Sequence, residues 1–327
     1  MIARKISDLI GNTPLLTLAV AEGMGTVLLK MEQYNPTGSA KIRIARNMVD
    51  EAEEQGLLKP GGWLVESTSG NTGVGLALIA AERGYKFSAV VDNHACADKQ
   101  RAMRAYGAEL INIGGDDDAL ATAARDAMAQ QLALDHGAYW TAQHLNPGNP
   151  NSYKPVAREL TDALGDDIDY LYGAVGTGGS LCGTGRHLRE RIPDLRIVGV
   201  EPAGSVIFGG PGAPYHQSGT GTPEGAEIGD LIDYDLIDEG IRVTDTEAFE
   251  TCRYLARRYG ILVGGSAGGV IYKALERARS LSSDTTIVVL VCDGGEKYLD
   301  TVYNDDWMTA AGLHDARVVN RLESMLR

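Results

Sequence analysis

The sequence has few cysteines and no pattern that would pair them. Its four cysteines (Cys96, Cys182, Cys252 and Cys292) lie far apart and form no C-x-x-C motif. This spacing is typical neither of a disulfide framework nor of a zinc site. The six histidines show no H-x-x-x-H pairing, so we predict no bound metal. A lone buried cysteine usually packs as a small apolar side chain, and we expect that role here, with a catalytic thiol as the alternative.

Long apolar runs and an excess of positive charge are also absent. No run approaches the roughly 20 apolar residues that span a bilayer. The first residues, MIARKISDLIGNTP, lack the apolar core and cleavage site of a secretory signal. The formal net charge is −14, whereas nucleic acids and anionic membranes bind proteins through an excess of Lys and Arg. We therefore predict a cytoplasmic protein that binds small molecules and has neither nucleic acid nor membrane as a partner.

The pattern of apolar residues predicts an α/β fold. The chain has 327 residues, of which 44% are hydrophobic and 23% charged, and this size suits two lobes. Short runs rich in Ile, Val and Leu (87–91, 170–175, 286–291) alternate with helical patterns (119–134, 246–258). Such strands are buried on both faces, which indicates open, mostly parallel sheets covered by helices. Ligands of such sheets bind where the carboxyl end of a strand turns into a helix.

One segment rich in turn residues, 35–41, ends in a lysine. Pro36 and Gly38 favour a turn, and Ser39 can cap the helix that follows. Lys41 would then project from the first helical turn, close to positive helix ends and away from bulk water. These conditions lower the pKa of an amine and favour a neutral, nucleophilic lysine. A capped surface helix with a solvated lysine is the simpler interpretation of this segment alone.

Three further turns lead from apolar runs into helical patterns. Segment 66–73 offers hydroxyls, an amide and free N–H groups that could bind a carboxylate, although a plain helix cap is the alternative. The residues of segment 176–180 have side chains small enough for backbone N–H groups to converge on a phosphate. The segment matches neither the Walker A nor the dinucleotide-binding motif. In segment 264–269 the Ser266 hydroxyl could bond a heteroaromatic nitrogen, or the small residues could serve packing alone.

Together and in this order, the segments resemble the fold-type II, β-replacing pyridoxal-phosphate enzymes, which include the cysteine synthases and cystathionine β-synthases. In places they are most similar to the siderophore-type N-(2-amino-2-carboxyethyl)-glutamate synthases. The resemblance covers nearly the whole chain, at residues 10–15, 35–41, 68–73, 143–150, 176–180, 264–268 and 295–299. It implies a tryptophan synthase β-like fold. Residues 1–41 and 146–327 would form a larger cofactor-binding domain, and residues 42–145 a smaller, mobile substrate-binding domain.

The resemblance also implies a role for each site residue. Lys41 would hold pyridoxal 5'-phosphate as a Schiff base and later move the substrate's α-proton. Asn71 would bond the cofactor's 3'-oxygen, and Ser266 would face its pyridine nitrogen. The cofactor phosphate would bind Gly176, Thr177, Gly178, Gly179 and Ser180, and the substrate carboxylate would bind Thr68, Ser69, Thr72 and Gln143. Relatives of this kind are usually homodimers, and we expect the same here.

Two of these positions bear on the chemistry. The family usually follows its lysine with Asp-Arg, whereas this chain has Ile42-Arg43; we expect the apolar residue to change the packing behind Lys41 without removing the chemistry. A serine at position 266 does not keep the pyridine nitrogen protonated, as an aspartate would. The resulting weaker electron sink suits β-replacement through an aminoacrylate and disfavours transamination.

The sequence leaves the substrates open. Segments 35–39, 201–210 and 293–303 are similar to enzymes that join O-phosphoserine to glutamate to give a 2,3-diaminopropionate precursor for siderophores or antibiotics, and we favour this reaction. Segments 176–180 and 264–268 look more like cysteine synthase, which uses O-acetylserine or O-phosphoserine plus sulfide, or cystathionine β-synthase. A serine/threonine dehydratase and a non-catalytic binding protein are remoter alternatives. Anionic substrates would need cations in this acidic protein. Arg43, Arg186 and Lys154 are candidates by position, although a solvated surface charge is the simpler interpretation of each.

Overall fold

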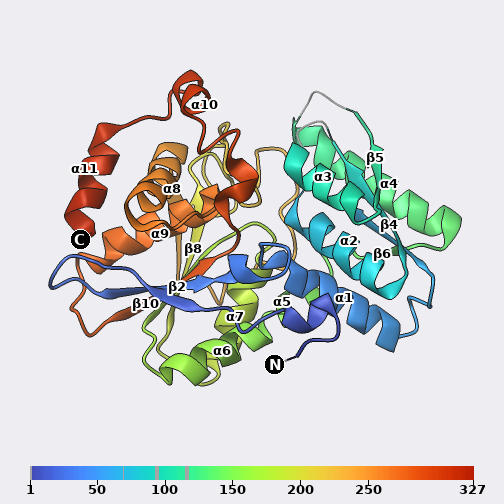
Figure 1. The fold of residues 1–327 in the computed structure, drawn as a ribbon, viewed down its shortest axis with the longest axis horizontal. Coiled ribbons are helices and arrows are strands. Elements are labelled where there is room, and N and C mark those ends of the chain that lie inside the picture. Colours follow the sequence, from blue (N-terminus) through green and yellow to red (C-terminus); the bar gives the residue numbers. More distant parts are fainter. Residues whose placement is uncertain (1, 69, 93–95, 115–117) are drawn as a thin grey trace.

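The structure is a computed structural model that describes residues 2–68, 70–92, 96–114 and 118–327. It contains a six-stranded sheet of order β1-β2-β10-β7-β8-β9 and a four-stranded sheet of order β5-β4-β3-β6 (Figure 1). Among the described residues, β1 runs antiparallel to β2 and the other paired strands are parallel. The predicted α/β class with mostly parallel sheets is confirmed.

The elements alternate along the chain much as the sequence predicts. The predicted helix 119–134 is α4, the helix 246–258 is α8, and the strand 286–291 is β10. The strands are β1 (Leu15–Thr17), β2 (Thr26–Met31), β3 (Trp63–Ser67), β4 (Lys86–Val91), β5 (Glu109–Asn112), β6 (Tyr139–Trp140), β7 (Tyr170–Ala174), β8 (Arg196–Pro202), β9 (Glu239–Val243) and β10 (Thr286–Val291). The α-helices are α1 (Lys41–Glu54), α2 (Asn71–Arg83), α3 (Ala97–Ala105), α4 (Asp118–His136), α5 (Gly148–Asn151), α6 (Lys154–Leu164), α7 (Gly179–Arg189), α8 (Asp245–Tyr259), α9 (Gly265–Ala278), α10 (Asp305–Ala310) and α11 (Ala316–Met325). Short 3-10 helices are η1 (Ile6–Leu9), η2 (Glu32–Tyr34) and η3 (Gly295–Tyr298).

Strand β10 lies at the centre of the larger sheet, between β2 and β7. Its side chains alternate between two hydrophobic clusters: Val288 and Leu290 belong to one, and Ile287, Val289 and Val291 to the other. Because successive strand residues point to opposite faces, this alternation buries both faces of the sheet. Helices α8 and α9 cover one face, and α6 and α7 cover the other (Figure 1). The carboxyl end of β10 is thereby fixed at the middle of the molecule.

The smaller sheet lies entirely within the part of the chain predicted as the smaller domain. Its strands fall between residues 63 and 140, and α2, α3 and α4 accompany it (Figure 1). Helix α1 packs against α2, so the lysine that begins α1 stands where the two sheets meet. The domain limits and the mobility of this lobe stay predictions. No helix formed by the described residues is long and apolar enough to cross a membrane.

Candidate active site

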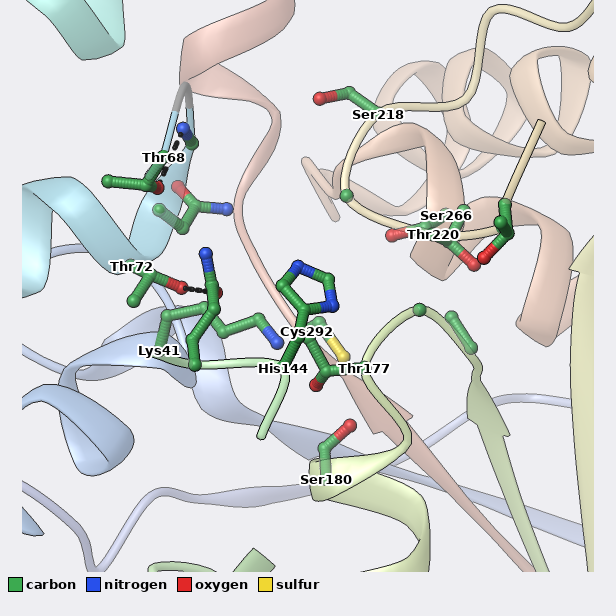
Figure 2. Close-up of a pocket in the computed structure, with 18 of the residues that line it drawn as sticks. Lys41, Thr68, Thr72, His144, Thr177, Ser180, Ser218, Thr220, Ser266 and Cys292 are labelled. Carbon is green, nitrogen blue, oxygen red and sulfur yellow. Dashed lines mark hydrogen bonds between the residues drawn. The ribbon is translucent and has the colours of Figure 1, made fainter. Parts of the chain in front are cut away.

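A cavity of about 240 Å³ lies where the turns after β3, β7 and β10 meet the start of α1 (Figure 2). All four predicted turns reach it. Ten of the predicted site residues line the cavity. Those on α1 and around the smaller sheet are Lys41, Thr68, Asn71, Thr72 and Gln143, and those beside the larger sheet are Gly176, Thr177, Gly178, Ser180 and Ser266. Gly179 lies behind the lining, and Ser69 falls outside the described residues. Folding thus brings together side chains separated by more than two hundred positions in the sequence.

Lys41 is the first residue of α1, and its amine points into this cavity (Figure 2). The Ser39 hydroxyl accepts the Lys41 N–H at 3.1 Å, which supplies a partner for one of the N–H groups that a helix start leaves unpaired. Burial lowers the pKa of the Lys41 amine, against the opposing effects of Cys292 and Asp293. The lowered pKa favours the neutral, nucleophilic form that the sequence predicts.

A buried ionic network holds the turn before Lys41. The Arg43 guanidinium donates to both carboxylate oxygens of Glu32, at 2.6 and 2.8 Å, and contacts Glu159 at 3.0 Å. Asn35, which opens the turn, accepts the Gly11 N–H at 2.9 Å and donates to the Glu32 carbonyl at 2.8 Å. Arg43 is therefore neither a substrate-binding cation nor a solvated surface charge, the two interpretations that the sequence left open. Its charge is buried and paired beneath the turn.

Ile42 occupies the core directly behind the lysine. Its side chain is fully buried and belongs to the cluster shared by α1 and α2. The two helices approach closely at Gly75 of α2, which has no side chain. A Cβ there would lie 3.2 Å from the Ile42 Cα and 3.0 Å from the Ala45 Cβ. An apolar side chain at position 42 therefore serves helix packing, as expected.

The turn between β3 and α2 presents hydroxyls at the start of a helix. The Thr68 hydroxyl accepts the N–H groups of Gly70 and Gly73 at 3.3 and 3.2 Å. The Thr72 hydroxyl donates to the Gln143 amide oxygen at 2.7 Å (Figure 2). Thr72 and Gln143 thus meet across two segments of the chain, next to a helix end that favours anions. This arrangement fits the predicted carboxylate site.

Asn71 is held from both ends of its amide. Its Nδ2 donates to the Asp293 carboxylate at 2.8 Å, and its Oδ1 accepts from the Lys297 ammonium at 3.0 Å. Lys297 also donates to the Gly38 carbonyl at 3.0 Å. The sequence prediction assigned no role to Asp293 or Lys297, although Lys297 lies within the resembling segment 295–299 and Asp293 lies two residues before it. They fix the orientation of the side chain predicted to bond the cofactor's ring oxygen.

The segment from Gly176 to Ser180 forms a cradle in which three of the five residues are glycines and the other two carry short hydroxyl side chains. Gly178 has φ +82°, which favours glycine, and α7 begins at the next residue. A Cβ on Gly179 would lie 2.0 Å from the Asn149 amide oxygen, and the same amide donates to the Thr177 hydroxyl at 3.1 Å. The first N–H groups of α7 lack intrahelical partners. With the Thr177 and Ser180 hydroxyls beside them, they fit a phosphate.

Two further side chains complete the lining of the cavity. Ser266 stands in the first turn of α9 and offers a neutral hydroxyl to the cavity (Figure 2). Cys292 follows β10 and also lines the cavity. Burial raises the pKa of the Cys292 thiol to about 11, so the group is protonated near neutral pH. This favours the packing role expected of the cysteines over a catalytic thiolate.

The cations of the cavity are not the ones predicted by position. Arg186 pairs with Asp233 at 3.0 Å near the surface, and Lys154 is exposed at the start of α6; neither lines the cavity. Lys99 of α3 and Arg125 of α4 line it instead. The sequence contains no signal for these two, because both lie in ordinary polar helices whose approach to the site depends on how the two sheets meet.

Two further features escaped the sequence prediction. The loop 218–227, which no strand or helix pattern marks, contributes Ser218, Thr220 and Glu227 to the lining. His144 lines the cavity as well (Figure 2). Its position directly after Gln143, in a segment already recognised, is a signal that could have identified it.

The lysine, the glycine-rich turn and the serine that line this cavity fit the pyridoxal-phosphate site that the sequence predicts. The chain belongs to the pyridoxal-phosphate dependent enzyme family, which it matches over residues 6–293. Within that family it is a cysteine synthase-like enzyme of the β-replacing, fold-type II group, and pyridoxal phosphate is its cofactor.

Individual relatives agree with this assignment. A protein of Sinorhizobium fredii named "Putative cysteine synthase" is 50% identical over 329 residues, covering 100% of this chain and 98% of the relative. The crystal structure of O-ureido-L-serine synthase superposes with a TM-score of 0.86 at 33% identity, covering 95% of this chain and 100% of that one. The O-acetylserine dependent cystathionine β-synthase from Helicobacter pylori gives a TM-score of 0.85 at 31% identity, covering 93% and 100%.

Proposed function

We propose that this enzyme joins O-phosphoserine to the amino group of an amino acid, with glutamate as the favoured partner, to give a 2,3-diaminopropionate precursor. The observation that supports this choice is Lys99. Its side chain is only 2% exposed, it lines the cavity, and no carboxylate of the described residues lies within ion-pair distance of it.

The surroundings of Lys99 explain why a buried ammonium there favours an anionic substrate. The ammonium donates to the Tyr298 hydroxyl at 3.2 Å and to the Ser218 hydroxyl at 3.4 Å, and it lies 4.9 Å from the Tyr298 ring centroid. Tyr298 in turn donates to the Asp293 carboxylate at 2.7 Å, so this carboxylate is linked to Lys99 through the Tyr298 hydroxyl. A buried charge with neutral partners is costly, and a phosphate or carboxylate of the substrate would provide the missing countercharge.

The other residues of the site divide the remaining tasks. The bound cofactor supplies an electron sink for the electrons of the bonds broken at the substrate's α- and β-carbons. Thr68, Thr72 and Gln143 orient the substrate carboxylate, while Lys41 takes the α-proton and returns it. The cradle of Thr177 and Ser180 holds the cofactor phosphate. These assignments are part of the proposal.

Cysteine synthesis is the second candidate. It is favoured by the name of the Sinorhizobium fredii relative, and sulfide as the nucleophile would need no recognition of a second carboxylate. Cystathionine synthesis, named for the Helicobacter pylori structure, is a third reaction on the same scaffold. All three begin with loss of a leaving group from an activated serine, and they differ in that leaving group and in the nucleophile that follows.

The deciding experiment separates the two halves of the reaction. The holoenzyme is mixed with O-phosphoserine, O-acetylserine or serine alone, and the cofactor's visible absorbance and the released phosphate or acetate are measured. Glutamate, homocysteine or sulfide is then added, and the product is identified by mass spectrometry. Stoichiometric phosphate release followed by a glutamate adduct supports the proposal. Turnover only with O-acetylserine and sulfide overturns it in favour of cysteine synthase.

A homodimer is also part of the proposal. The segment before β1 leaves large apolar side chains uncovered, with Ile2 97%, Ile6 44% and Leu9 51% exposed. Apolar surface of this kind suits contact with a second copy. Light scattering of the holoenzyme tests this expectation, and a mass equal to one chain at micromolar concentration would contradict it.

A further inference from the structure

His144 is a titratable group in the cavity that the reaction described so far does not use. It follows Gln143 in the loop between β6 and α5, and Figure 2 shows its ring projecting into the cavity near Lys41 and Cys292. The ring makes no hydrogen bond to the described residues. An imidazole that served only packing would ordinarily have a fixed partner for at least one nitrogen.

The neighbouring backbone leaves room for this ring. A Cβ on Gly229 would lie 3.2 Å from the His144 Nδ1, so the loop that lines the cavity at Glu227 passes directly against the imidazole. Any larger residue at position 229 would press on the ring. The loop 218–229 and His144 therefore form one wall of the cavity.

The charges around His144 favour its neutral form. Burial lowers the pKa of the imidazole, the positive charges of Lys41 and Arg125 lower it further, and Asp126 opposes them. Glu227 is the remaining charged group of this wall. A neutral imidazole accepts a proton, whereas it cannot anchor a phosphate dianion, and this separates its role from that of Lys99.

We propose that His144 is the base that accepts the proton lost by the incoming amino group. This inference rests on the proposed function, because it concerns an amine nucleophile. The incoming amino group is an ammonium near neutral pH: one N–H bond breaks, its proton passes to the imidazole, and the electron pair left on nitrogen forms the bond to the substrate's β-carbon. The phosphate has already left with the electron pair of its C–O bond. Lys41 returns the α-proton at the adjacent carbon, so it is not available as a second acceptor.

The requirement for a base depends on the nucleophile. An ammonium must lose a proton before its nitrogen can form the new bond to carbon, and a positioned general base contributes typically about 100-fold to 10,000-fold to such a step. Hydrogen sulfide is already partly ionised near neutral pH, so its hydrosulfide ion can attack without a base. A role of His144 in proton transfer therefore predicts an effect on amines that sulfide does not share.

The test uses the full-length holoenzyme with His144→Phe, which keeps an aromatic ring of similar size, and His144→Gln, which keeps hydrogen bonding without basicity. The matched control is His187→Phe, because His187 lies on the outer part of α7 and contacts Glu190 at 3.1 Å. Cofactor absorbance and unfolding temperature establish that each variant is folded and loaded. Phosphate release without nucleophile measures the first half-reaction.

We expect both His144 variants to release phosphate at the wild-type rate and to react with sulfide within about twofold of wild type, while the glutamate step slows by about 100-fold or more. Added imidazole should restore part of the glutamate rate in His144→Phe. The acidic limb of the wild-type pH profile for glutamate, where the imidazole becomes protonated, should vanish in both variants.

Other outcomes overturn the inference in distinguishable ways. If the His144 variants lost reaction rate equally with glutamate and with sulfide, or released phosphate more slowly, His144 would have a packing role and not a role in proton transfer. A wild-type glutamate rate in both variants would overturn the inference alone. A wild-type enzyme that accepts sulfide but no amine would overturn the proposed function and this inference with it.

Discussion

At the scale of single residues, our proposal assigns two tasks to the amine of Lys41: to bind the cofactor and to move the α-proton. Lys41→Ala should therefore lose the cofactor's visible Schiff-base absorbance and reduce turnover by at least about 100-fold. Absorbance spectra and steady-state kinetics check both effects. Persistent full activity in this variant would refute the proposed role of Lys41.

Lys99 is the residue that we expect to distinguish anionic from neutral leaving groups. Lys99→Met removes the charge and keeps the length of the side chain. A charge-assisted hydrogen bond contributes about 1.5–3 kcal/mol, so kcat/KM for O-phosphoserine should fall by roughly 10-fold to 100-fold, with a much smaller change for O-acetylserine.

The matched control for Lys99 is Lys154→Met, which removes an exposed charge on α6 outside the cavity. It should leave both substrates unaffected. Equal losses for O-phosphoserine and O-acetylserine in Lys99→Met would show that Lys99 acts on the fold and not on the leaving group.

Glu66 links pH to stability. Burial raises the pKa of its carboxyl from the usual 4.5 to about 8, against hydrogen bonds from Thr141 and the Gln143 N–H that lower it. Between these two pH values the folded protein keeps a proton that the unfolded chain has lost. The free energy of unfolding should therefore fall as the pH rises from about 4.5 to about 8.

The variant Glu66→Gln removes this titration. Compared with wild type, its unfolding temperature should rise more at about pH 8 than at about pH 5. The same change at the exposed Glu54 of α1 is the control and should leave the pH dependence unchanged. Parallel curves for wild type and Glu66→Gln would contradict the raised pKa.

At the scale of elements, the start of α7 depends on the absence of a side chain at Gly179. A Cβ there would collide with the Asn149 amide at 2.0 Å and disturb its bond to Thr177. Gly179→Ala should therefore weaken cofactor binding, with an overpacking cost of about 1–3 kcal/mol. Cofactor titration by absorbance or fluorescence measures the effect.

Gly185→Ala on the same helix provides the comparison. Its Cβ would meet the end of the flexible Ile197 side chain at 2.6 Å, far from the cradle. We expect a stability cost without a comparable loss of cofactor affinity. A similar loss in both variants would mean that α7 packing in general, and not the cradle, limits binding.

The elements also show what the sequence could and could not predict. Strand β10 was recognised to the residue because five of its six residues are β-branched, which favours a strand. The four turns were recognised because glycine and hydroxyl residues recur at strand ends. Lys99 and Arg125 could not be found in this way, because their helices are polar surface helices by pattern. The structural role of Arg43 could not be predicted, because its partners Glu32 and Glu159 are adjacent to it only in space.

At the scale of the whole molecule, the net charge of −14 opposes the approach of anionic substrates. Salt screens such repulsion over about 10 Å at 0.1 M. The kcat/KM for O-phosphoserine should therefore rise between about 0.01 and 0.15 M salt, while that for the zwitterionic O-acetylserine should change little. Stopped-flow measurement of the first half-reaction at several salt concentrations checks this. A fall with salt would show that the local field of Lys99 and Arg125 dominates the approach.

The ionic network beneath the lysine turn has a consequence for how such a site can be transplanted. Arg43 forms ion pairs with Glu32 and Glu159, and the Asn35 side chain accepts a hydrogen bond from the Gly11 N–H. The conformation of the lysine turn therefore depends on three other segments: the amino-terminal loop with Gly11, the 3-10 helix η2 with Glu32, and helix α6 with Glu159, which is more than a hundred residues away. A chimaera between relatives would have to exchange these three segments together with the turn. A graft of segment 35–41 alone would transfer the lysine without the contacts that orient it.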